Sequence, residues 1–151
     1  MTGTETSESH VDTVECPNCG ARNRVRAAST GIAQCGRCHN PLPWVTTADD
    51  SDFEQVVVNS TLPVLLDLWA PWCGPCRIVE PGVRQAAQTY AGRLKAVKVN
   101  VDEAPGLARR FQAQSIPMVL VLHRGEVHRT QVGALPPAAL VSWVGEALEP
   151  A

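Results

Sequence analysis

The chain has 151 residues, of which 44% are hydrophobic and 19% are charged, and its formal net charge is −2. This length allows one domain of about 100 residues together with a smaller one, and the composition is ordinary for a folded protein. The small net charge excludes a global field that would hold nucleic acid or an anionic membrane surface. No run of about 18 apolar residues is present to span a membrane.

Residues 1–15 are polar, contain neither Lys nor Arg, and show no apolar period. We therefore expect a flexible tail without secondary structure. The same residues lack the charged and apolar regions of a secretory signal, so the sequence predicts a cytoplasmic protein.

Four of the six cysteines lie in residues 16–43, as the pairs Cys16/Cys19 and Cys35/Cys38 with 15 residues between them. This spacing is typical of a tetrahedral zinc site. The segment has few large apolar side chains and cannot form a core unaided. Four thiolates leave no coordination position for water, so we predict a small zinc ribbon around one structural zinc ion.

The cysteines and arginines of the sequence also allow three other interpretations. Six cysteines could form three disulfides in a secreted chain, but the missing signal favours metal and redox chemistry. Cys35-Gly-Arg-Cys38-His39 also fits a haem attachment motif, which the upstream cysteine pair disfavours, so no haem is expected. Alternating arginines at positions 22, 24 and 26 could face nucleic acid, but a zinc tetrathiolate is itself negative and no aromatic platform is interleaved, so no such partner is expected.

The pattern changes after Pro43, and residues 44–151 alternate between strand-like and helix-like stretches. In chain order we expect a strand at 44–46, a helix at 51–57 opened by a capping box of Ser51 and Glu54, a buried central strand at 64–70, a long helix from Cys73 to Gly92 kinked at Pro81, a strand at 97–101, a helix at 105–111, an antiparallel hairpin of 118–122 and 126–132, and a closing helix from Pro136-Pro137 to Leu148. This order predicts an α/β domain with a mixed central sheet and helices on both faces.

The third cysteine pair lies in Trp72-Cys73-Gly74-Pro75-Cys76, where the central strand ends and the long helix begins. Free backbone N–H groups and the helix dipole favour a thiolate there, so Cys73 is the expected nucleophile. Cys76 lies on the same helical face and can close a disulfide as the resolving thiol. Pro75 stiffens the turn, and Gly74 leaves room for an incoming chain. Because the cysteine pair carries the redox chemistry, no flavin is expected in this chain.

This motif resembles the active site of the thioredoxin family, and the resemblance covers about residues 44–148. It implies the thioredoxin fold, with Asp67 as an acid beneath Cys76, Lys98 as its lysine partner, and Ile116-Pro117 as a cis-proline loop facing the disulfide. Other matching positions are Phe53, Trp69, Pro81, Asn100, Asp102, Gly125 and Gly133. The ribbon ahead of this domain resembles the narrower group of zinc-binding bacterial thioredoxins.

The resemblance implies a protein-disulfide reductase that is recharged by a thioredoxin reductase and acts on protein disulfides, with a monomer as the expected state. Burial of Asp67 should raise its pKa, which suits proton exchange with Cys76, and Lys98 should offset part of the rise. Without the resemblance, Asp67 would be interpreted as a hydrogen-bonded structural acid and Lys98 as a solvated strand residue. Pro117 and Pro81 would be interpreted as a turn and a kink.

Met118 departs from the family pattern, which usually has Thr after the cis-proline, and the flexible thioether could alter groove contacts. Two alternatives to a general reductase also stay open. The ribbon could recruit one particular partner, or oxidation of its thiolates could release zinc as a redox switch.

Overall fold

The computed structural model describes residues 10–149 and contains two sheets. The first is a two-stranded antiparallel sheet of β1 (Val11–Glu15) and β2 (Arg22–Arg26). The prediction of an unstructured tail is therefore wrong for 11–15, and its remaining part, residues 1–9, lies outside the described residues. The strand was missed because its side chains are mostly polar and its order comes from backbone pairing with β2.

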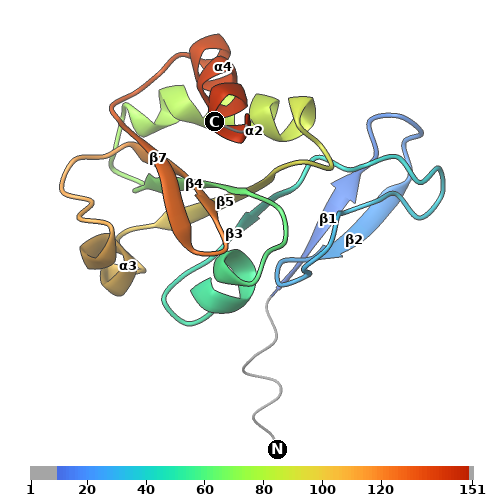
Figure 1. Cartoon of the computed structure of the whole chain (residues 1–151), viewed down its shortest axis with the longest axis horizontal. Helices are drawn as coiled ribbons and strands as arrows, with labels where there is room; N and C mark the ends of the chain where they lie inside the picture. Colours follow the sequence, from blue (N-terminus) through green and yellow to red (C-terminus); the bar gives the residue numbers. More distant parts are fainter. Residues whose placement is uncertain (1–9, 150–151) are drawn as a thin grey trace, which may run out of the picture.

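The second sheet has five strands in the order β3-β5-β4-β6-β7 (Figure 1). Their bounds are Val45–Thr47 for β3, Val64–Trp69 for β4, Lys95–Asn100 for β5, Met118–His123 for β6 and Glu126–Val132 for β7. The first three strands are parallel, and β6 and β7 are antiparallel to their neighbours. The predicted mixed sheet, its central strand and its hairpin are all confirmed.

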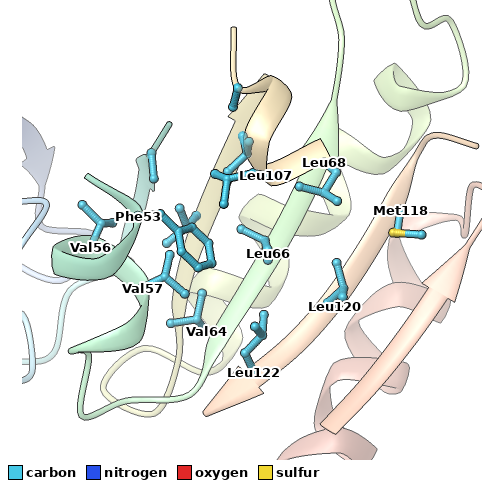
Figure 2. Packing of buried hydrophobic residues seen from close by; sticks show 14 of the residues in the cluster. Phe53, Val56, Val57, Val64, Leu66, Leu68, Leu107, Met118, Leu120 and Leu122 are labelled. Carbon is cyan, nitrogen blue, oxygen red and sulfur yellow. The ribbon is translucent and has the colours of Figure 1, made fainter. Parts of the chain in front are cut away.

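Four helices cover this sheet: η1 (Glu54–Val58), α2 (Cys76–Thr89), α3 (Pro105–Arg110) and α4 (Pro137–Leu148). Figure 1 shows α2 and α4 on one face, and η1 and α3 on the other. Each face has its own buried apolar cluster. Figure 2 shows the cluster on the η1 and α3 face, where alternate residues of β4 and β6 meet η1 and α3. The predicted helices on both faces are confirmed.

The predicted capping box of Ser51 and Glu54 is wrong. The reciprocal pair is made instead by Asp49 and Asp52, ahead of the helix. The Asp49 carboxylate accepts a hydrogen bond from the Ser51 backbone N–H at 2.8 Å, and the Asp52 carboxylate accepts one from the Asp49 N–H at 2.9 Å. Aspartate serves this role as well as serine does. The turn therefore forms at residues 49–52, and the helix that follows it is a π-helix beginning at Glu54.

A buried lysine joins the two sheets. Lys95 on β5 is fully buried, and its ammonium donates to the carbonyl of Ala27, just after β2, at 2.5 Å and to that of Val56 at 2.6 Å. The Trp44 ring lies 4.5 Å from the ammonium. Burial lowers the pKa of Lys95 to about 8, against the opposing charge of Asp52, so the ammonium remains the main form at neutral pH.

Replacing Lys95 with Met should loosen the segment after β2. The Ala27 and Val56 carbonyls would lose a buried donor, while relief of the ammonium's desolvation limits the change in global stability. We expect the backbone amide of Ala27, which donates to His10, to exchange hydrogen about tenfold faster. Arg93→Met, at an exposed position in the turn just before β5, is the control and should change nothing. Equal exchange in both variants would contradict this docking role.

Candidate functional site

The site is centred on a disulfide between Cys73 and Cys76 at the start of α2. Their Cα atoms lie 5.4 Å apart, within the range that a disulfide bridges. Cys73 and Cys76 are 4% and 6% exposed, so burial does not tell the two sulfurs apart. A hydrogen bond does: the backbone N–H of Cys76 donates to the Cys73 sulfur at 3.2 Å. This donor at a helix N-terminus favours negative charge on Cys73.

The rim of the disulfide contains the residues that the resemblance singled out. Trp72 is 69% exposed, and its indole N–H donates to Asp102 at 3.1 Å. The Ile116–Pro117 peptide bond is cis, and Ile116 packs against the small buried cluster of Ala70, Cys73 and Cys76. The backbone N–H of Gly133 donates to the Pro117 carbonyl at 2.9 Å.

Open space borders this rim on two sides. A Cβ atom added at Gly74 or at Gly133 would meet no atom within 4 Å. Gly133 also has a φ of +100°, which disfavours any side chain. Pro75 is the N-cap residue of α2, directly before Cys76.

Met118 does not face this open rim. Its side chain is buried in the core cluster on the η1 and α3 face, as Figure 2 shows, and it is 8% exposed. The structure therefore does not support a direct groove contact by its thioether.

A pocket of about 180 Å³ lies beneath the disulfide, and Asp67, Cys76, Glu80 and Lys98 are among the residues that line it. Asp67 is 1% exposed. Burial raises its pKa to about 7, the positive charge of Lys98 lowers it, and the negative charge of Glu80 adds to the rise. The expected direction of the Asp67 shift is confirmed.

The expected register of Asp67 and Lys98 is observed, because they are direct partners on the parallel strands β4 and β5. Their expected ion pair is not formed. Within residues 10–149, the Lys98 ammonium is paired with Glu80 instead. Sequence analysis missed Glu80, although its position four residues after Cys76 on one helix face was a usable signal.

The four remaining cysteines form a second cluster. Their sulfurs all lie within 4.8 Å of one another, and the Cys16–Cys38 and Cys19–Cys35 sulfurs are each 3.6 Å apart. Zinc–sulfur bonds of about 2.3 Å in a tetrahedron place sulfurs about 3.8 Å apart. The donor set and its geometry therefore fit a zinc ion.

The surroundings of this cluster act in opposite directions on two of its sulfurs, Cys35 and Cys19. Backbone N–H groups of Cys38 and Arg37 lower the pKa of Cys35 to about 5. An amide N–H of Ala21 lowers the pKa of Cys19, but burial and the neighbouring sulfurs outweigh it and raise that pKa to about 11.

A redox-active cysteine pair at a strand-to-helix turn of a mixed sheet defines a thiol–disulfide oxidoreductase. The Thioredoxin family model matches residues 44–146, and the chain belongs to the thioredoxin family. The chain is 47% identical over 98 residues to a thioredoxin of Haemophilus influenzae, covering 65% of this chain and 92% of that protein. It is 44% identical over 102 residues to a thioredoxin of Pyropia yezoensis, covering 68% and 95% of the two chains.

A further relative is the chloroplastic thioredoxin M5 of Oryza sativa subsp. japonica, which is 39% identical over 120 residues, or 80% of this chain and 68% of that protein. Thioredoxins act on protein disulfides and are recharged by a reductase. These relatives favour a general oxidoreductase over a partner-specific module or a zinc-release switch. No helix within residues 10–149 has the length and apolar character needed to cross a membrane.

Proposed function

We propose that the protein reduces disulfides of cytoplasmic proteins as a monomer, with Cys73 as the nucleophile and Cys76 as the resolving thiol. The observation that carries these roles is the hydrogen bond from the Cys76 N–H to the Cys73 sulfur at the start of α2. It favours a thiolate at Cys73 before that sulfur attacks. A thioredoxin reductase would return two electrons to the pair.

The reaction proceeds in two exchanges. The Cys73 thiolate attacks a substrate disulfide, forms a mixed disulfide, and releases one substrate thiolate. Cys76 then loses its proton to the Asp67 carboxylate and attacks the Cys73 sulfur. The bond between Cys73 and the substrate breaks, and the second substrate thiolate leaves and takes a proton from water. The substrate has gained two electrons and the protein is left with the Cys73–Cys76 disulfide.

The substrate chain would lie over the rim formed by Trp72, Gly74, the Ile116–Pro117 loop and Gly133. The open space at Gly74 and Gly133 supports this placement, as does the exposed Trp72 ring. Backbone groups beside the cis-proline would pair with an extended substrate. Recognition of backbone would give low sequence specificity.

Replacing Cys76 with Ser should trap substrates covalently. Cys73 would still attack, but no second thiol would release the mixed disulfide. We expect bands of higher mass on non-reducing gels of a lysate treated with this variant, and their loss after dithiothreitol. The Cys73→Ser/Cys76→Ser double variant is the matched control and should capture nothing. If the single variant also captures nothing, the roles of the two sulfurs are wrongly assigned.

We also propose that the ribbon holds one structural zinc ion through Cys16, Cys19, Cys35 and Cys38, as in zinc-binding bacterial thioredoxins. When bound, the ion would cross-link the two cysteine pairs. The fit of the four sulfurs supports this proposal, and so does the N–H donor of Arg37 at 3.4 Å from the Cys35 sulfur. Free thiols of this kind also fit a reducing compartment such as the cytoplasm.

A further inference from the structure

Glu80 is one of the residues that line the pocket beneath the disulfide, and it has two cationic partners. One carboxylate oxygen accepts from the Lys98 ammonium, and the other accepts from the Arg84 guanidinium at 2.7 Å. The Glu80 and Lys98 side chains are 31% and 17% exposed, so their pair is partly shielded from water. Such a pair is held more firmly than one on an open surface.

The Lys98 ammonium therefore interacts with two carboxyl groups, with Glu80 as an ion pair and with Asp67 through its charge. Asp67 is the direct register partner of Lys98, yet its buried Oδ1 atom has no hydrogen-bond partner among the described residues. Lys98 also lies 5.0 Å from the Trp69 ring. A pair with Glu80 requires less desolvation than one with the fully buried Asp67, which explains why the ammonium turns to α2.

We propose that Glu80 is a positioning residue for the reaction, because it holds the Lys98 ammonium. The Asp67 carboxyl, in the pocket that Cys76 also lines, is thereby left without an ion-pair partner among residues 10–149. This inference rests on the proposed role of Asp67 as the proton acceptor for Cys76. The first turn of α2 after the active-site motif, which carries Glu80, would thereby have a role in proton transfer.

The charges around the pocket are consistent with this role. Burial keeps the pKa of Asp67 near 7, and Glu80 adds to the rise that Lys98 opposes. Burial would raise the pKa of Glu80 as well, but Lys98 and Arg84 outweigh it, so Glu80 stays ionised. The other charged groups that line this pocket or the two adjoining hollows at Lys98 are Arg77, Arg84, His10, Asp12, Glu15, Asp49, Asp52 and Glu103.

An Asp67 pKa near 7 suits both directions of the reaction, since a base near the working pH is the most effective. The carboxylate accepts the Cys76 proton during resolution, and the acid form returns a proton to the Cys76 thiolate when the disulfide is reduced again. Loss of Glu80 would free Lys98 to pair with Asp67. Asp67 would then be more fully ionised at neutral pH and a weaker base.

The test is the titration of Asp67 in the oxidised full-length protein, followed by carbon NMR of its side-chain carboxyl. In this state neither Cys73 nor Cys76 titrates. We expect Glu80→Gln to shift the Asp67 midpoint downward by at least about one pH unit. The acid limb of the pH profile of insulin reduction should move to lower pH with it, because the base form is then reached earlier. Glu146→Gln removes a carboxylate that pairs with Arg129 on β7, and it should shift neither.

A second pair of variants tests whether Glu80 acts through Lys98. In a Lys98→Met background, Glu80→Gln should shift the Asp67 midpoint by less than half as much as in the unaltered protein. An equal shift in both backgrounds, or none in either, overturns the proposal. Rescue by Glu80→Asp supports it only if the midpoint returns upward. Failure of the proposed function would be seen separately, as the absence of trapped substrate on the Cys76→Ser variant.

Discussion

Replacing Cys73 with Ser should abolish disulfide reduction, lowering the rate by at least about 10³-fold, because a hydroxyl oxygen cannot enter disulfide exchange. Insulin reduction with dithiothreitol as the electron donor measures the loss. The fold should be unchanged, since serine is nearly isosteric and the disulfide and hydrogen bond that Cys73 shares with Cys76 lie within one turn of the chain. Cys19→Ser changes one sulfur to oxygen in the ribbon and is the control. It should keep the reduction rate within about twofold.

The same variant tests the ionisation on which the mechanism depends. In the reduced protein, iodoacetamide at neutral pH should label Cys73 first, because the Cys76 N–H and the helix N-terminus stabilise its thiolate. Labelling in Cys73→Ser should be slower by at least about tenfold. If labelling is unaffected, or if Cys73→Ser still reduces insulin while Cys76→Ser does not, the nucleophile is the other sulfur.

The catalytic domain could be predicted from sequence because its patterns are local and unambiguous. The apolar run from Val64 to Trp69 indicated a strand covered on both faces, and it is the central strand. The turn at 123–125 joined two strand-like runs, and they pair antiparallel. The active-site motif could be placed because a strand end and a helix start flank it directly.

Contacts between distant parts of the chain could not be predicted in the same way. β1 is ordered by pairing with β2 and by a hydrogen bond from Thr46 to Asp12 at 2.6 Å. Neither contact can be predicted from the residues of β1 itself. Lys95 follows the alternation of Val97 and Val99 on β5, which could have placed it on a buried face. Its acceptors, however, come from segments far away along the chain.

The choice of partner for Lys98 shows a further limit. Register predicts that Lys98 and Asp67 are neighbours, and they are. It does not predict which carboxylate the ammonium selects, because that depends on how deeply each acid is buried and on a third element, α2. A lysine that can reach two acids needs the desolvation of both to be compared.

The second large effect should come from metal removal. We expect one zinc ion per chain in the purified protein, and we expect a chelator to unfold the ribbon while β3 to α4 remain folded. Zinc binding to a structural site contributes about 10–16 kcal/mol. Burial of a large apolar side chain contributes only about 1.5–3 kcal/mol, and in the ribbon cluster the large apolar side chains are Val25, Leu42 and Trp44. Without the cross-link, the segment has too little core to stay ordered.

Limited trypsin digestion measures this unfolding. After chelation, cleavage at Arg22, Arg24 and Arg37 should accelerate by at least about tenfold, because an ordered backbone resists the protease. Arg109 on α3 is the internal control and should stay protected, and zinc added back should restore resistance in the ribbon. Reduction of insulin should continue in the metal-free protein, since Cys73 and Cys76 lie on α2 and not in the ribbon. Unchanged cleavage in protein shown to be free of zinc would mean that docking through Lys95 and Trp44, and not the metal, orders the ribbon.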